Sequence, residues 1–398
     1  MIVLTNQKMY QYGSSPSKIR ELFEYGKKRK SEIGEELVFD YSLGNPSVAS
    51  PNIVNETLVS LINNTDPTLL HGYTSAAGDL RVRESIASYL NKTYGVNHLA
   101  SLIYLTVGAA ASLTISLNAL LNKDEEVIVF APFFPEYRVF VEKAGGVLKV
   151  VNPVEPFFTP DFLELEKVIN ENTKAVIINS PNNPTGVVYN EETIKKIASI
   201  LENKSQEYHH PIYLISDEPY RELVYGQVEV PFISKYYDNT IICYSFSKSL
   251  SLPGERIGYI VVSEKCTIAS ELFLAICGAG RSLGFVCAPA LFQYMIPSCL
   301  GKTSDLEVYK KNRDLLYEAL TSYGYEVVRP DGAFYLFVKA LGGDADSFSE
   351  FAKKYELLLV PSDSFGYLGY VRIAYCVSTK QVEASLFAFK KLIEEYQK

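Results

Sequence analysis

The chain alternates short apolar runs with longer segments in which apolar residues recur every three or four positions. The short runs predict buried strands, and the longer periodic segments predict amphipathic helices. The apolar runs occur at residues 102–106, 126–130, 147–151, 175–179, 212–216, 240–244 and 257–262. Because strands that alternate with helices usually pair in parallel, we predict an α/β fold whose large domain has a mostly parallel sheet covered by helices.

The pattern changes after about residue 291, where strands and helices no longer alternate regularly. A long helical segment precedes a strand pair, a helix, two short strands and a final helix, which is typical of a smaller α+β domain. These elements are expected at residues 306–323, 325–329, 333–338, 347–355, 357–360 and 369–374 and after residue 379. We predict a large domain at residues 45–295 and a small domain of residues 1–44 and 296–398, including an N-terminal arm.

Residues that could carry chemistry follow five of the predicted strands. Each lies within a few residues of the carboxyl end of its strand, and they are Gly108, Phe134, Asn183, Asp217 and Lys248. In an open α/β sheet, ligands bind outside the carboxyl ends of the strands. We therefore expect these residues to meet in one crevice, because coincidence explains one such loop easily and five poorly.

Lys248 lies in a serine-rich stretch at residues 244–258, between two apolar runs. A lysine in such a turn is in most cases exposed and solvated, but burial lowers the pKa of an amine and frees it as a nucleophile. Asp217 could likewise be only a strand-end residue that caps the following turn. Together, a lysine nucleophile and a carboxylate fit a pyridoxal phosphate site, where the lysine forms a Schiff base and the carboxylate pairs with the pyridinium nitrogen.

Other residues near these strand ends fit the same cofactor. The helix that starts at Gly108-Ala109-Ala110 offers backbone N–H groups to a phosphate, although small residues at helix starts are common. Arg256 adds a permanently charged, bidentate phosphate partner. Phe134 could stack on the pyridine ring, although most aromatic residues in such a run belong to the core.

Four motifs stand in the order found in one enzyme family. In chain order they are Tyr73-x-x-x-x-Gly78, Asn183-Pro184-Thr185-Gly186, Asp217-x-x-Tyr220, and Ser245-x-Ser247-Lys248 with Pro253-Gly254-x-Arg256-x-Gly258. With these motifs the chain resembles, over nearly its whole length, the class I/II aminotransferases, which are aspartate aminotransferase-like, fold type I pyridoxal-phosphate enzymes. The resemblance implies a transferase of amino acid metabolism that uses pyridoxal 5'-phosphate. It would move an amino group between an α-amino acid and a 2-oxo acid by a ping-pong mechanism.

The resemblance also implies a role for each matching residue. Lys248 would hold the cofactor covalently and later shuttle a proton, and Asp217 would pair with the ring nitrogen. Asn183 and Tyr220 would hydrogen-bond the phenolic oxygen of the cofactor, and Phe134 would stack on its ring. Lys248, Asp217 and Tyr220 are thus the expected catalytic residues.

The cofactor phosphate would lie among backbone N–H groups, hydroxyls and one guanidinium. The residues expected there are Gly108, Ala109, Ala110, Ser245, Ser247 and Arg256. The family often has a hydroxyl in the first of these loops, but this chain has only alanines after Gly108, which leaves backbone donors. Tyr73 would reach the phosphate of the neighbouring subunit, so the resemblance implies a homodimer with shared active sites.

Arg372, in an apolar strand of the small domain, matches the family's cation for the substrate carboxylate. A strand arginine can otherwise be a surface ion-pair partner. Asn183 and Gly44 would assist, since glycine permits close approach of backbone to substrate. Arg281 is a candidate for binding a second carboxylate, but a structural ion pair explains it at least as well, so aspartate specificity is not supported.

Composition narrows the expected partners and compartment. The 398 residues carry a net charge of −8, which argues against nucleic-acid binding. Six scattered cysteines and four histidines without metal-ligand spacing suggest reduced thiols, a cytoplasmic location and no metal site, and no signal peptide is recognisable. The uncharged residues 282–301 include two prolines, so we expect a buried connection and helix there and no membrane span.

Two further functions stay open. The same residues serve lyases of this fold that cleave a C–S bond or close a small ring, because the cofactor supplies the chemistry and the pocket selects the bond. A non-catalytic, ligand-binding relative is the other alternative. It is disfavoured because Lys248, Asp217 and Arg372 are all present and residues 1–44 lack the length and basic character of a DNA-binding domain.

Overall fold

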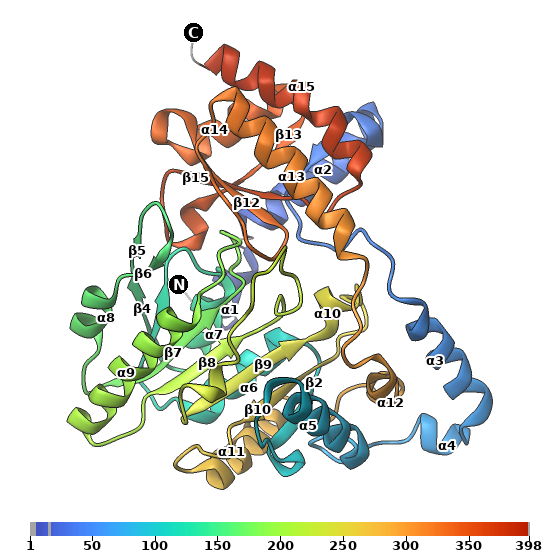
Figure 1. The fold of residues 1–398 in the computed structure, drawn as a ribbon, viewed down its shortest axis with the longest axis vertical. Helices are drawn as coiled ribbons and strands as arrows, with labels where there is room; N and C mark the ends of the chain where they lie inside the picture. Colours follow the sequence, from blue (N-terminus) through green and yellow to red (C-terminus); the bar gives the residue numbers. More distant parts are fainter. Residues whose placement is uncertain (1–4, 15–16, 397–398) are drawn as a thin grey trace. The chain divides into compact units, whose positions relative to one another are not determined.

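The computed structural model describes residues 5–14 and 17–396, and the chain divides into two compact units. The large unit comprises residues 46–307 and 331–333. The small unit comprises residues 1–45, 308–330 and 334–398. Figure 1 shows the elements of both units in the colours of the sequence.

The large unit is built on a seven-stranded sheet with the strand order β2-β10-β9-β8-β7-β3-β4. The strands are β2 (Ile103–Thr106), β3 (Glu126–Phe130), β4 (Val147–Val151), β7 (Thr173–Asn179), β8 (Tyr213–Asp217), β9 (Thr240–Ser245) and β10 (Gly258–Val262). Strand β10 pairs antiparallel with both of its neighbours, so β2 and β9 run in the same direction. The remaining pairs are parallel, and the predicted α/β fold with a mostly parallel sheet is confirmed.

Helices pack along this sheet from one edge to the other, α5 on β2, α6 on β9 and β10, and α7 and α8 on β4 (Figure 1). The helices of the large unit are α3 (Asn52–Asn64), α4 (Pro67–Leu70), α5 (Leu80–Tyr94), α6 (Ala109–Leu120), α7 (Glu136–Lys143), α8 (Phe162–Val168), α9 (Glu191–Tyr208), α10 (Phe246–Ser249), α11 (Ala269–Ser282) and α12 (Ala290–Cys299). A short hairpin joins β5 (Pro153–Val154) to β6 (Thr159–Pro160). Asn190 caps α9 through a 2.9 Å bond from the Thr193 backbone N–H to its Oδ1.

The burial of the central strands explains why their sequences are almost continuously apolar. Every residue of β2, β3, β8, β9 and β10 is buried, as expected for strands of a sheet covered on both faces. Ile103 and Val261 of the sheet pack in one core cluster with Ile86 of α5 and Met295 of α12. This core fixes the sheet whose edge carries the predicted site residues.

The large unit continues beyond the boundary predicted at residue 295, which falls inside α12. Met295, Ile296 and Cys299 of this helix are buried in the large-unit core, and α12 packs against α3 and α5. Farther along, the backbone N–H of Ser304 donates to the carbonyl of Ser249 at 2.8 Å. The apolar face of α12 therefore keeps residues 296–307 with the large unit.

The small unit has a four-stranded antiparallel sheet of order β11-β12-β15-β14 and a parallel pair of β1 with β13. The strands are β1 (Phe39–Asp40), β11 (Val327–Val328), β12 (Tyr335–Lys339), β13 (Leu357–Leu358), β14 (Val360–Pro361) and β15 (Tyr370–Ala374). The helices are α1 (Gln7–Ser14), α2 (Lys18–Ile33), α13 (Leu306–Tyr323), α14 (Ala345–Ala352) and α15 (Thr379–Tyr396). Strand β1 is only two residues long, because the backbone N–H and the hydroxyl of Ser42 turn back to bond the Asp40 carboxylate.

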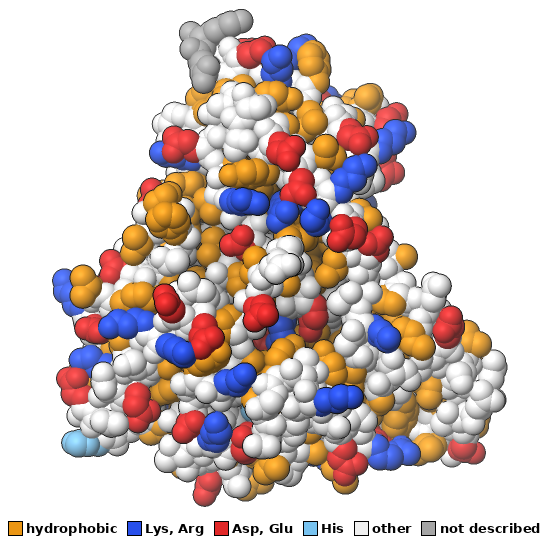
Figure 2. Space-filling model, in the orientation of Figure 1, with side chains coloured by type: hydrophobic (Ala, Val, Ile, Leu, Met, Phe, Trp, Pro, Cys, Tyr) orange, Lys and Arg blue, Asp and Glu red, His pale blue; other side chains and the backbone are white. Residues whose placement is uncertain are grey.

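Figure 2 shows acidic and basic side chains intermingled over one face of the molecule. No helix within residues 5–14 and 17–396 is both long and apolar enough to cross a bilayer. The uncharged residues 282–301 contain helix α12, with Pro297 inside it, as the sequence predicted. All six cysteines lie in the described ranges, and each is a free thiol.

Candidate active site

The topology of the large-unit sheet brings the five predicted loops to one edge. Strands β2, β9, β8, β7 and β3 point the same way, so their carboxyl ends lie together. Strand β10 runs in the opposite direction, so its first residue, Gly258, lies at this same edge and pairs with both Thr106 and Ser245. The start of the antiparallel strand thus adds Arg256 to the residues contributed by the parallel ones.

Asp217, the last residue of β8, is buried at this edge. Its Oδ2 accepts a 2.6 Å hydrogen bond from the Tyr137 hydroxyl, and the side-chain amide of Asn179 donates to its backbone carbonyl at 2.9 Å. Within the described residues, its Oδ1 is buried and has no hydrogen-bond partner. Burial raises the pKa of this carboxyl to about 7, against the opposing effect of the Tyr137 bond.

The unpaired oxygen is the feature by which the site can be tested for fit to pyridoxal phosphate. A buried carboxylate without a cationic partner is costly, whereas a protonated ring nitrogen supplies both a positive charge and a hydrogen-bond donor. The chemistry of Asp217 therefore fits the pyridine nitrogen of the cofactor.

Asn183 lies in a loop that is stabilised by hydrogen bonds from its backbone N–H groups to nearby asparagine side chains. Asn179 at the end of β7 accepts a 2.8 Å bond from the Asn183 N–H. The Oδ1 of Asn182 accepts from both the N–H and the hydroxyl of Thr185, at 3.0 and 2.8 Å. Asn183 is buried, as is Tyr220 on the neighbouring loop after β8. The two residues predicted to bind one cofactor oxygen thus follow adjacent strands.

Lys248 belongs to the short helix α10, which directly follows β9. The Ser245 hydroxyl caps this helix by accepting from the Ser247 N–H at 3.1 Å, and it donates to the Ser247 hydroxyl at 2.7 Å. Lys248 itself is half-buried. The cap fixes the start of α10 and therefore the backbone position of Lys248. It also holds the hydroxyls of Ser245 and Ser247 next to each other.

Arg256 lies against Gly108 at the start of helix α6. Arg256 has a positive φ of 52°, and its Nη1 donates to the Pro253 carbonyl at 3.0 Å. Gly108 has a φ of 91°, and a Cβ at this position would lie 2.8 Å from Nη2 of Arg256. A glycine is therefore required for the guanidinium to approach the N-terminus of α6. Helix N–H groups beside a guanidinium form a site suited to a phosphate.

The other predicted cofactor residues differ in their surroundings. Ala109 and Ala110 are the first two residues of α6. Phe134 is half-buried and makes an edge-on contact with the Tyr137 ring, with centroids 5.7 Å apart. The Tyr73 side chain is 99% exposed, so within this chain it extends into solvent.

Arg372 and Gly44 lie together in the small unit. Arg372 of β15 is 2% exposed, its Nη2 donates to the Ser42 carbonyl at 2.5 Å, and its guanidinium lies 4.6 Å from the centroid of the Tyr335 ring. A Cβ at position 44 would collide with the Tyr335 hydroxyl, so this position requires glycine. Arg281, the other candidate cation, is exposed near the end of α11 in the large unit.

Tyr137 and Asn179 are functional candidates that the sequence reasoning missed. Tyr137 follows Phe134 by one helical turn, and Asn179 pairs in register with Asp217 across the β7–β8 ladder. A polar residue at the carboxyl end of the strand next to Asp217 was an available signal for Asn179. The bond from Tyr137 joins residues 80 positions apart and follows no local pattern.

Comparison with known proteins identifies the family. The family described as "Aminotransferase class I and II" matches residues 38–388. The chain belongs to this family. The aminotransferase is 31% identical over 378 residues to the aspartate aminotransferase of Thermotoga maritima, covering 92% of this chain and 95% of that enzyme. It is also similar to two solved structures.

One of these is an amino transferase from Eubacterium rectale, 54% identical, with a TM-score of 0.98 and 100% of both chains covered. The other is the aspartate aminotransferase of Thermus thermophilus with maleate, 26% identical, with a TM-score of 0.86 and 98% and 100% of the two chains covered. The predicted family, fold and transaminase activity are thereby confirmed, and enzymes of this family are generally pyridoxal-phosphate-dependent. The roles assigned to individual residues stay predictions.

Proposed function

We propose that this aminotransferase binds pyridoxal 5'-phosphate at the carboxyl edge of the large-unit sheet and uses it to exchange amino groups between α-amino acids and 2-oxo acids. The observation that carries the proposal is the buried Oδ1 of Asp217, which has no hydrogen-bond partner in the part of the chain that the structure describes. When bound, the cofactor supplies the electron sink that stabilises negative charge at the substrate Cα. The chain itself would bind and orient the cofactor and the substrate, and it would move protons between them.

Asp217 would keep a proton on the ring nitrogen. Because Oδ2 is engaged by Tyr137, Oδ1 is the oxygen left to face that nitrogen. The pairing would return Asp217 to its ionised form, since a nearby cation lowers the pKa that burial has raised. Tyr137 would orient the carboxylate, and Phe134, in edge-on contact with Tyr137, would cover one face of the ring.

The phosphate would be bound by Arg256, by the first N–H groups of α6 at Gly108, Ala109 and Ala110, and by the hydroxyls of Ser245 and Ser247. The proximity of Arg256 to Gly108 supports this assignment, as does the pairing of Gly258 with both Thr106 and Ser245. Asn183 and Tyr220 would hydrogen-bond the phenolic oxygen. Lys248 Nζ would hold the cofactor covalently and then carry the proton that leaves the substrate Cα.

The proposed assembly is a cytoplasmic homodimer in which Tyr73 reaches the phosphate bound to the partner subunit. The exposure of the Tyr73 side chain is consistent with a group that acts outside its own chain. Six free thiols are consistent with a reducing compartment.

Arg372 would bind the substrate α-carboxylate, and Gly44 and Asn183 would assist. Replacing Arg372 with alanine should raise KM about 100-fold for every α-amino acid, because a charge-assisted, bidentate contact common to all of them is lost. Steady-state kinetics with several donors tests this. Arg329→Ala is the matched control, since Arg329 is exposed and also lies over an aromatic ring, that of Tyr317. A KM increase confined to one donor would mean that Arg372 binds a side chain.

A half-reaction screen tests the proposed function as a whole. The loaded enzyme is mixed with one amino acid at a time, and the visible absorbance of the cofactor is followed. Aspartate is the first donor to test, because aspartate aminotransferases are among the relatives. We expect the absorbance to decrease with at least one amino acid and to recover when a 2-oxo acid is added. Release of ammonia or thiol without any need for an oxo acid would instead indicate a lyase.

A further inference from the structure

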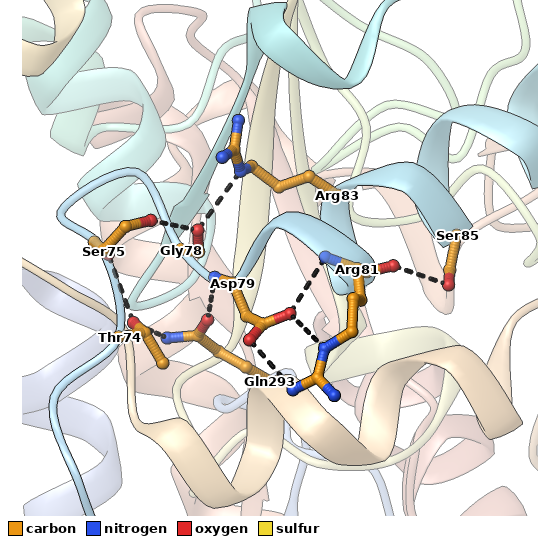
Figure 3. Close-up of polar contacts among 8 residues, drawn as sticks. All are labelled: Thr74, Ser75, Gly78, Asp79, Arg81, Arg83, Ser85 and Gln293. Atoms are coloured by element: carbon orange, nitrogen blue, oxygen red, sulfur yellow. Dashed lines mark hydrogen bonds and ion pairs between the residues drawn. The ribbon is translucent and has the colours of Figure 1, made fainter. Parts of the chain in front are cut away.

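Tyr73 depends on its loop for its position, because almost nothing in this chain touches its exposed side chain. The loop runs from the end of α4 to the start of α5, and a chain segment this short can be held by a few bonds. Two of those bonds, to Thr74 and Asp79, come from Gln293, a residue of α12 that lies 214 positions from Asp79 in the sequence (Figure 3).

The Gln293 amide is completely buried and is bonded on both sides. Its Oε1 accepts from the backbone N–H of Asp79 at 2.9 Å. Its Nε2 donates to the hydroxyl of Thr74 at 3.0 Å and to the carbonyl of Ala288 at 2.6 Å. The Asp79 N–H can only donate and the Ala288 carbonyl can only accept, so the orientation of the Gln293 amide is fixed.

The far side of the loop is held by other contacts. The backbone N–H of Leu105 in β2 donates to the Ala77 carbonyl at 2.9 Å. The Arg83 Nε donates to the Gly78 carbonyl at 3.2 Å, and the Ser75 hydroxyl bonds the same carbonyl (Figure 3). These contacts fix residues 77 and 78. The bond from Gln293 to Thr74 acts directly beside Tyr73.

We propose that Gln293 is a positioning residue for the active site of the partner subunit: it anchors Thr74 and Asp79 and thereby sets the direction in which Tyr73 leaves the chain. This inference rests on the proposed function, in which the Tyr73 hydroxyl bonds the cofactor phosphate across the dimer. Gln293 touches neither cofactor nor substrate. Its contribution to cofactor binding is transmitted through the loop.

A purely structural role for Gln293 makes a different prediction. A buried, fully bonded amide stabilises any fold, and its removal costs stability wherever it lies. In that case the loss of Gln293 and the loss of the Tyr73 hydroxyl would act on cofactor binding independently. If Gln293 acts through Tyr73, the two reductions in cofactor-binding free energy are not additive. Once the loss of Gln293 has moved Tyr73 away from the phosphate, removing the tyrosine hydroxyl has no further effect.

The experiment is a double-mutant cycle on the dissociation constant of pyridoxal phosphate, measured by fluorescence titration of the apo dimer. Tyr73→Phe and Gln293→Met should each weaken binding about 10-fold, the value of one hydrogen bond to a charged group. The double variant should bind about as weakly as either single variant. A double variant weakened by the product of the two effects, about 100-fold, would overturn the inference.

A milder variant keeps the inference testable if Gln293→Met does not fold. Thr74→Val is nearly isosteric and removes the hydroxyl that accepts from Gln293 and donates to the Ser75 carbonyl, leaving the bonds from Gln293 to Asp79 and Ala288 in place. It should weaken cofactor binding about 5-fold and have no further effect in the Tyr73→Phe background. Binding equal to wild type would contradict the proposed path from Gln293 to Tyr73.

Asn312 provides the matched control. Its completely buried amide donates to the Tyr375 and Val377 carbonyls at 3.1 and 2.8 Å and accepts from Thr379 at 2.8 Å, all within the small unit. Asn312→Leu should lower the thermal midpoint as Gln293→Met does, and any effect on cofactor binding should multiply with that of Tyr73→Phe.

The outcomes separate this inference from the proposed function. A wild-type protein that does not bind pyridoxal phosphate contradicts the proposed function. If the wild type binds but Tyr73→Phe has no effect, the path through Tyr73 is wrong while the site at Asp217 and Lys248 still stands.

Discussion

Replacing Lys248 with alanine should lower transamination turnover by about 10⁴-fold. The amine is expected to serve both as the covalent anchor and as the base that moves the Cα proton, and a positioned acid–base group alone contributes about 10²–10⁴-fold. The variant should fold and still bind pyridoxal phosphate, because Asp217 and the residues proposed to bind the phosphate are intact. Borohydride should no longer fix the chromophore to the protein.

Two measurements check this prediction. Turnover is measured with a donor identified in the half-reaction screen, and covalent retention of the cofactor is measured by mass spectrometry after borohydride treatment. Lys265→Ala is the control, since Lys265 is an exposed lysine that follows the next strand, β10. Retention of a borohydride-fixed chromophore in Lys248→Ala would assign the anchor to a different lysine.

Replacing Asp217 with asparagine should lower turnover about 10³-fold while making the apo protein more stable at neutral pH. Turnover should fall because the charge proposed to hold the proton on the ring nitrogen is lost, and with it a preorganised electrostatic contribution. An amide can still accept the Tyr137 bond, so the local geometry should survive. Steady-state kinetics of the reconstituted variant gives the first measurement.

The stability effect follows from the raised pKa of Asp217. Burial raises the pKa to about 7 in the folded protein, from a value of 3.8. Between pH 4 and pH 7 the unfolded chain releases a proton that the folded protein retains, so the free energy of unfolding falls as pH rises through this range and levels off above it. The asparagine variant does not ionise. The free energy of unfolding of the variant should equal that of the wild type near pH 4 and exceed it by a few kcal/mol (order of magnitude) above pH 7.

Urea unfolding of both apo proteins from pH 4 to pH 8 measures this difference. Asp238→Asn, at an exposed position two residues before β9, should leave the pH dependence unchanged. A wild type that gains stability over the variant as pH rises would mean that Asp217 already has a cationic partner in the apo protein.

The sequence alone determined much of the fold because its information is local. Continuous apolar runs specify strands that are buried on both faces, and β2, β3, β8 and β9 lie where those runs predicted them. The helix in residues 282–301 was predictable for the same reason, since neighbouring residues decide it. The motif around Lys248 likewise identified the family before any geometry was known.

The direction of β10 and the extent of the large unit were decided only by the tertiary structure. An apolar run has the same pattern whichever way the strand points, so the sequence could not show that β10 is antiparallel and starts beside Thr106 and Ser245. The assignment of α12 depends on where its apolar face packs, and both units could have accepted an apolar helix. Because α12 packs in the core of the large unit, residues 296–307 belong to that unit.

The electrostatic state of the site was also beyond the sequence. The free Oδ1 of Asp217 and its raised pKa depend on burial and on Tyr137, which lies 80 positions away. The anchoring of the Tyr73 loop depends on Gln293, 219 positions from Thr74. A sequence lists which groups are present, but hydrogen bonds between distant residues exist only once the chain has folded. The sequence thus determined the residues of this site, and the fold determined which atoms remain available for the cofactor.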